Sequence, residues 1–257
     1  MLFTTSCDDD TTQDVTPSDP LSGWTKVGEA SDHDGVYTVE LYAQKDLFVG
    51  YQRVTARVYN LGKLVTDANV VFEPMMTMAT MEHSCPSEQP AYVDATRGYE
   101  GAITFIMESG MMGTWEVTTH VDHDGNHVHM DVPVMVMAPD EDKLLSWISP
   151  VDSTVYFMAL VEPMNPEVGE NDYQVALYKR QSMMDFPAVE GFTMTIEPEM
   201  PTMGHGSPNN VDPIEMENGH YKGVVNFTMT GMWYVHNDVY DADNNMVTDG
   251  QYFQITF

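Results

Sequence analysis

The chain has 257 residues, of which 42% are hydrophobic and 11% aromatic, and this is enough apolar material for the core of one large domain or of two ordinary ones. Its 40 acidic residues outnumber its 10 lysines and arginines, so the formal net charge is -30 at pH 7. Such a charge repels the phosphates of nucleic acids and anionic lipid surfaces, and we expect no nucleic-acid partner. The same charge attracts cations.

The first 22 residues differ in composition from the rest of the chain. Cys7 follows apolar and small residues and precedes Asp8-Asp9-Asp10 and a segment rich in Thr, Asp and Pro. This order resembles the lipobox of bacterial lipoproteins, which implies a lipid on Cys7 and a place in the bacterial cell envelope, at the outer membrane. Residues 1–22 are then a signal remnant and a disordered acidic tether. The alternative is an acidic tail with an unmodified cysteine. Because no other segment is apolar over about 18 residues, we expect membrane contact only through the lipid.

Short runs rich in Val, Tyr, Phe and Thr recur along the chain, separated by turn residues about every 8–12 positions, as at 36–42, 53–59 and 223–229. This spacing is typical of antiparallel β-sandwiches. No segment of about ten or more residues keeps a helical period, which argues against most α/β enzyme architectures. The sequence therefore predicts an all-β fold of immunoglobulin-like antiparallel sandwiches.

The second half of the chain repeats the first, because a set of landmarks occurs twice in one order. The matched segments are Phe72-Glu73-Pro74 with Ile196-Glu197-Pro198, Met81-Glu82-His83 with Met203-Gly204-His205, Phe105-Ile106-Met107 with Phe227-Thr228-Met229, and Gly113-Thr114-Trp115 with Gly231-Met232-Trp233. A repeat of this length indicates two copies of one domain. We expect a first sandwich at residues 23–138 and a second at 139–257.

The order of these landmarks, Glu-Pro, Met-x-His, Phe-x-Met and Gly-x-Trp, resembles the YtkA-like and FixH-like domains. These are small immunoglobulin-like sandwiches of bacterial envelopes, related in shape to copper-resistance carriers. The resemblance covers most of both halves. It implies two tandem sandwiches that take part in copper handling.

Methionine is the most unusual feature of the composition, with 22 residues against ten leucines. Cores are usually built from Leu, Ile and Val, so this excess indicates selection for the thioether. Thioether sulfur prefers Cu(I), and an added imidazole suits copper in an oxidising compartment. In each half, methionines lie with a histidine in an expected loop after the Glu-Pro pair and again beside Gly-x-Trp. The candidate Cu(I) ligands are Met76, Met78, Met81, His83, Cys85, Met111, Met112, Met200, Met203, His205 and Met232. The alternative role of any single methionine is to fill a gap in the core.

Residues 115–132 predict a β-hairpin whose turn is Asp124-Gly125, a pair that tolerates positive φ. This turn sets His120 opposite His129 and Asp122 opposite His127, all four on the face away from the core. Opposed side chains have Cβ atoms about 5 Å apart, so these residues are candidate ligands for Cu(II) or Zn(II). The alternative is a solvated face that happens to carry histidines.

The sequence contains no Gly-x-Ser-x-Gly, P-loop or His-Glu-x-x-His motif, and we do not expect an enzyme. The prediction is a lipid-anchored, extracytoplasmic protein that captures, buffers or hands over copper. Its expected partners are copper ions and an outer-membrane transporter or a copper-accepting protein. The alternative function is a non-catalytic adhesion module, or an accessory module of a transporter, in which methionine and histidine are incidental.

Overall fold

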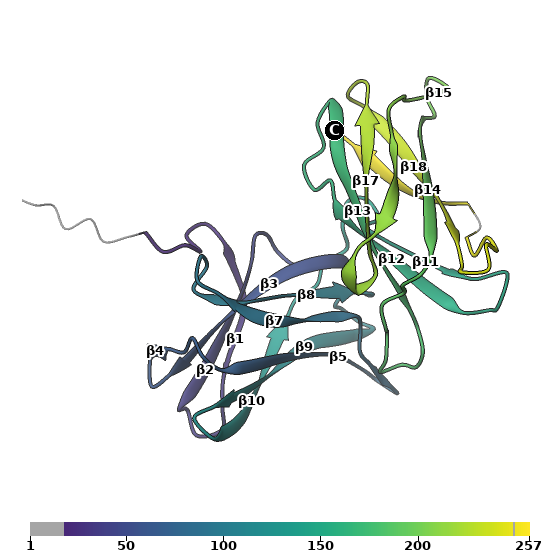
Figure 1. Cartoon of the computed structure of the whole chain (residues 1–257). Coiled ribbons are helices and arrows are strands. Elements are labelled where there is room, and N and C mark those ends of the chain that lie inside the picture. The colour runs from purple at the N-terminus through teal and green to yellow at the C-terminus, as the bar shows by residue number, and fades with distance from the viewer. Residues whose placement is uncertain (1–17, 249) are drawn as a thin grey trace, which may run out of the picture.

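The computed structural model describes residues 18–248 and 250–257, which form two β-sandwiches in tandem (Figure 1). Cys7, the expected lipid-bearing residue, lies outside the described residues. Within the described residues the one helical element is the short 3-10 turn η1 (Glu217–Gly219), and no helix there is long and apolar enough to cross a membrane. The predicted all-β class is confirmed.

The first sandwich packs one sheet of order β1-β2-β3-β8-β7, with β4 added beside β3, against a second sheet of order β10-β9-β5-β6. The strands are β1 (Thr25–Ser31), β2 (Tyr37–Ala43), β3 (Gly50–Asn60), β4 (Lys63–Leu64), β5 (Asn69–Met78), β6 (Glu82–His83), β7 (Ser87–Val93), β8 (Gly98–Phe105), β9 (Gly113–His123) and β10 (Asn126–Val134).

The second sandwich repeats this topology, with one sheet of order β11-β12-β13-β17-β16 and another of order β15-β14-β18-β19. Its strands are β11 (Leu144–Ile148), β12 (Val155–Glu162), β13 (Gly169–Lys179), β14 (Thr193–Met200), β15 (His205–Gly206), β16 (Val211–Glu215), β17 (His220–Phe227), β18 (Met232–Tyr240) and β19 (Gln251–Thr256). The internal repeat seen in the sequence is therefore also a repeat of strand order.

Each sandwich has its own core, because alternate residues of each strand point inward. In β2, for example, Tyr37, Val39 and Leu41 are buried while their neighbours are partly exposed. Trp115 on β9 and Trp233 on β18 are buried in the two cores at equivalent positions. A third apolar cluster, which includes Phe157 and Tyr178 of the second sandwich and Ile106 of the first, joins the two domains.

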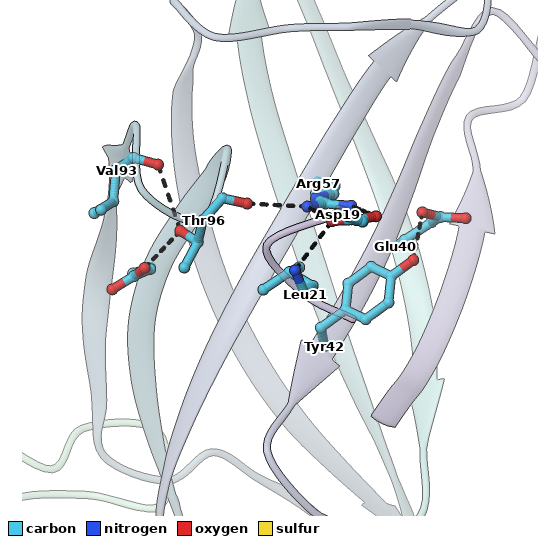
Figure 2. Close-up of polar contacts among 8 residues, drawn as sticks. Asp19, Leu21, Glu40, Tyr42, Arg57, Val93 and Thr96 are labelled. Carbon is cyan, nitrogen blue, oxygen red and sulfur yellow. Dashed lines mark hydrogen bonds and ion pairs between the residues drawn. The ribbon is translucent and has the colours of Figure 1, made fainter. Parts of the chain in front are cut away.

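The first sandwich begins earlier in the chain than the expected tether boundary at residue 22. Asp19 accepts hydrogen bonds from both terminal nitrogens of Arg57, and Arg57 also donates to the carbonyl of Thr96 (Figure 2). The hydrogen bond from Arg57 lowers the pKa of Asp19 to about 2. Leu21 is buried beside this pair. The segment from Asp19 to residue 22 is therefore part of the folded domain.

Candidate metal-binding sites

The methionine-rich segment after Pro74 is a strand and not the expected loop. Strand β5 pairs with β9 along its whole length, from Asn69 opposite Asp122 to Met78 opposite Gly113. The turn that follows is short and is closed by the Met78 N–H, which donates to the carbonyl of Met81 at 2.9 Å. The methionines up to Met78 therefore have fixed orientations set by the pleat.

This pairing brings His83, Met76 and Trp115 together across three adjacent strands. Met76 on β5 lies opposite His83 on β6 and also opposite Trp115 on β9, so the three side chains share one face of the sheet. That face is the core face, since Met76 and Trp115 are fully buried and His83 is only 2% exposed. The imidazole meets the indole edge-on, with 5.3 Å between ring centroids.

His83 carries a buried nitrogen that no group in the described part of the chain satisfies. Its Nδ1 lies 2.9 Å from the carbonyl oxygen of Ser84, which can only accept, so Nδ1 holds the proton and Nε2 holds a lone pair. Nε2 is buried and has no hydrogen-bond partner among the described residues. Such a group costs about 1–3 kcal/mol when nothing binds it. A histidine that ligates a metal commonly has this arrangement, with its other nitrogen fixed by a carbonyl.

The surroundings of Trp115 explain the Gly-x-Trp landmark. The indole Nε1–H donates to the carbonyl of Met107 at 2.9 Å, and the ring packs against Phe105. A Cβ atom on Gly113 would lie 3.1 Å from Cε of Met76 and 2.7 Å from a backbone oxygen. Glycine is therefore needed where the chain passes the thioether of Met76.

The second sandwich builds the same trio from Met200, His205 and Trp233. Met200 on β14 lies opposite His205 on β15, and the ring centroids of His205 and Trp233 are 6.0 Å apart in an edge-on arrangement. Trp233 donates to the carbonyl of Met229 at 3.0 Å, and a Cβ on Gly231 would lie 3.1 Å from Cε of Met200. His205 is partly exposed, so this trio is the more open of the two.

The remaining candidate methionines lie around the trios. In the first sandwich Met78 is partly buried, while Met81, Met111 and Met112 are exposed. Met111 and Met112 form the tip of a tight turn whose last residue, Gly113, lies opposite Met78, so the three belong to one end of the sheet.

At the corresponding place in the second sandwich Met203 is exposed and Met232 is partly exposed. The Met203 N–H donates to the carbonyl of Met200 at 3.1 Å, so this methionine lies in the turn directly after its trio. Each turn therefore carries an exposed thioether shortly after the methionine of its trio.

Cys85 is buried and borders a cleft of about 730 Å³ between the two sandwiches. Burial raises the pKa of its thiol well above the usual range. Because the thiolate is the form that binds metals, this environment disfavours Cys85 as an anionic ligand. The cleft is also bordered by Glu88 of the first sandwich and Met184 of the second.

The hairpin has the register that the sequence predicts. Asp124 and Gly125 both have positive φ, His129 lies opposite His120, and His127 lies opposite Asp122. All four candidate ligands are on the outer face, but they form separate contacts.

The side chains of His127 and Asp122 are bonded to each other, which lowers the pKa of Asp122. The Nε2 atom of His120 lies 2.9 Å from a carboxylate oxygen of Glu73, and the ring centroids of His120 and His129 are 6.0 Å apart. Nowhere in residues 18–248 and 250–257 do three or more His, Cys, Asp or Glu side chains converge on one point that would hold an ion.

Sequence reasoning did not include the two tryptophans among the site residues. Trp115 and Trp233 each touch the histidine of their own trio at equivalent positions. The signal that could have identified them is the Gly-x-Trp landmark itself, which follows the Met-x-His segment in both halves.

Comparison with known proteins finds one family model that matches part of the second sandwich. Residues 151–237, which run from β12 into β18 and include the Met200, His205 and Trp233 trio, match the sequence model of the YtkA-like family. Assignment of the first half to this family, and the FixH-like resemblance of both halves, remain predictions. No curated protein matches the chain. Among solved structures, the Escherichia coli adhesin FdeC is similar at 13% identity and a TM-score of 0.28, covering 85% of this chain and 63% of that one.

Proposed function

We propose that the protein binds two Cu(I) ions, one at each trio of methionine, histidine and tryptophan, and that it captures, buffers or hands over copper outside the cytoplasm. The observation that carries the proposal is the buried lone pair on Nε2 of His83 beside the thioether of Met76. One neutral imidazole and one or two neutral thioethers form a donor set that favours Cu(I) over harder divalent ions.

The geometry of the trio supports a soft monovalent ion in two further ways. A donor set without carboxylate leaves the ion its positive charge, and the face of an indole attracts a cation at distances up to about 6 Å. Both tryptophans are held in place by a hydrogen bond to a backbone carbonyl, that of Met107 or Met229, so the rings are fixed before any ion arrives. The exposed Met81 and Met203, one turn beyond each trio, are suited to passing the ion between solvent and the buried pair.

The net charge of -30 supports the same function, because a strongly acidic surface raises the local concentration of cations. A lipid anchor at Cys7 in the bacterial outer membrane would keep the protein where copper enters the cell envelope. The partner would then be an outer-membrane transporter or a copper-accepting protein. The hairpin face with His120 and His129 is proposed as a weaker site for Cu(II) or Zn(II), since its side chains have to move together to share an ion.

The experiment is titration of the protein with Cu(I) under anaerobic conditions against a competing chelator, read together with tryptophan fluorescence. The proposal expects two ions per chain and a partial loss of tryptophan emission, because two of the four tryptophans, Trp115 and Trp233, adjoin the sites. A variant with His83→Gln and His205→Gln is expected to bind neither ion tightly. If the unmodified protein binds no Cu(I), the methionines and histidines are incidental, and an adhesion or accessory module becomes the better hypothesis.

A further inference from the structure

The two trios have the same chemistry but different surroundings. His83 is 2% exposed, whereas its counterpart His205 is partly exposed. The strand pairings and the anchoring of the tryptophan are alike in both copies. The difference must therefore come from what lies outside each trio.

The first trio adjoins the junction between the sandwiches. The Ser84 N–H donates to the carbonyl of Met183 in the second sandwich at 2.9 Å, while the Ser84 carbonyl accepts from Nδ1 of His83. One residue of the first sandwich thus bonds both to the candidate ligand and to the other domain. The second trio has no such neighbour in the described residues, since β15 lies at the end of its sandwich remote from the first sandwich (Figure 1).

The segment that contacts Ser84 is residues 180–188, which lie in the connection between β13 and β14. Its shape is held by the N–H groups of Gln181 and Ser182, which both donate to the carbonyl of Asp185. Phe186 at its far end is buried and packs edge-on against Phe157, with 5.7 Å between ring centroids. This segment therefore has a fixed shape where it contacts the first sandwich at Ser84.

Buried polar contacts fasten the two sandwiches at the same place. Glu88 on β7 accepts from Nε2 of His220 on β17 at 2.7 Å, and the hydroxyls of Tyr51 and Tyr178 donate to the same carboxylate at 3.2 and 3.3 Å. Gln174 donates to the other ring nitrogen of His220 at 2.9 Å. The bonds that Glu88 accepts from His220 and Tyr178 cross the junction and exist only while the domains are together, which favours the joined arrangement.

The apolar side of the junction connects to the first trio through the chain. Ile106 of the first sandwich packs against the cluster that contains Phe157, Tyr178 and Phe186. The next residue, Met107, is the one whose carbonyl holds Trp115. The second sandwich therefore contacts the chain beside the trio at two places, Ser84 and Ile106.

We propose that the second sandwich closes the first metal site, so that copper enters and leaves the Met76 and His83 pair only when the junction opens. This inference rests on the proposed function. The open Met200 and His205 pair then exchanges copper freely at the tip of the molecule, and the covered pair retains it. The protein then holds one copper ion that exchanges readily, in the second sandwich, and one that exchanges slowly, in the first.

The test measures release of Cu(I) to an excess of a coloured chelator by stopped flow, in the full chain. One variant, Met200→Leu with His205→Gln, keeps only the first site, and another, Met76→Leu with His83→Gln, keeps only the second. We expect release from the first site to be at least about tenfold slower, which corresponds to about 1.4 kcal/mol of opening free energy.

Two junction variants, Glu88→Gln and Phe186→Ala, are then added separately to each single-site protein. Both are expected to speed release from the first site and to leave the second unchanged. Lys26→Gln is the matched control, because Lys26 forms ion pairs only with Glu29 and Glu40 of the first sandwich among the described residues. Should Phe186→Ala fail to fold, Glu88→Gln keeps nearly the same volume and still tests the junction.

Equal release rates from the two sites, or a first-site rate that neither junction variant changes, would overturn the closure while leaving copper binding intact. Absence of Cu(I) binding in both single-site proteins and in the unmodified chain would overturn the closure and the proposed function together.

Discussion

Replacement of Met76 by leucine separates a ligand from a packing residue more sharply than any other single change. Met76 is fully buried, yet leucine has nearly its volume and apolarity, so Met76→Leu should cost less than about 1.5 kcal/mol of unfolding free energy. At roughly 4 °C per kcal/mol for a domain of this size, the melting temperature of the first sandwich falls by less than about 6 °C. A truncation to alanine would instead cost about 2–5 kcal/mol.

The effect on copper should be large, because leucine has no sulfur. Loss of a residue that merely supports a ligand already weakens metal sites by about 10–100-fold, and we expect at least this loss at the first site for Met76→Leu. The assay is anaerobic competition for Cu(I) against a chelator, with thermal unfolding followed on the same samples. Met130→Leu is the matched control, since Met130 is equally buried in the same sandwich but lies on β10, outside the trio.

The reasoning would be refuted if Met76→Leu left Cu(I) affinity at the first site unchanged, or if Met130→Leu reduced it as much. A large loss of stability with unchanged affinity would assign Met76 to packing alone.

Three further predictions concern other parts of the chain. The pair of Asp19 with Arg57 lowers the pKa of Asp19 from 3.8 to about 2. The pair therefore stabilises the folded state above pH 3.8, and this stabilisation disappears as the pH falls toward 2. Because Asp19 is half exposed, Asp19→Ala should cost about 1 kcal/mol of unfolding free energy, measured in urea, at pH 7 and almost nothing at pH 2. The thiol of Cys85, buried and with a raised pKa, should resist alkylation by iodoacetamide at pH 7.5 until the protein is unfolded, and rapid labelling of Cys85 in the native protein would contradict this burial. If the hairpin binds Zn(II), imidazole must coordinate in its neutral form, so calorimetric affinity should fall as the solution is acidified and vanish in a His120→Ala, His129→Ala variant; an unchanged variant would make this face a solvated strand.

Local patterns predicted much of the fold. The Asp124-Gly125 turn determines the hairpin register residue by residue, because only positions that tolerate positive φ can form a two-residue turn there. The repeated landmarks likewise predicted the shared topology of both sandwiches, since the order of strands follows the order of the repeat.

The site itself was predicted only in part. Met76 and Met78 were expected in a loop because Thr and Glu surround them, but pairing with β9 extends β5 through both residues. Tertiary pairing of this kind overrides local composition. The result is that Met76 and His83 became buried neighbours, a relation that spacing along the chain does not reveal.

The junction was beyond sequence reasoning because its partners are far apart in the chain. Glu88 and His220 are separated by 132 positions, and neither has a neighbouring residue that signals a contact. Asp19 was assigned to the tether for a related reason, since its partner Arg57 lies on a strand 38 positions later. Ion pairs between distant elements leave no periodic pattern in the sequence.

X-ray absorption spectroscopy of the protein loaded with Cu(I) tests the central claim most directly, because it reports the atoms bound to the metal. The account predicts two copper ions per chain, each with sulfur neighbours and one imidazole nitrogen, and loss of half of the sulfur signal when Met76→Leu and His83→Gln remove the first site. A first shell made only of nitrogen and oxygen would contradict it.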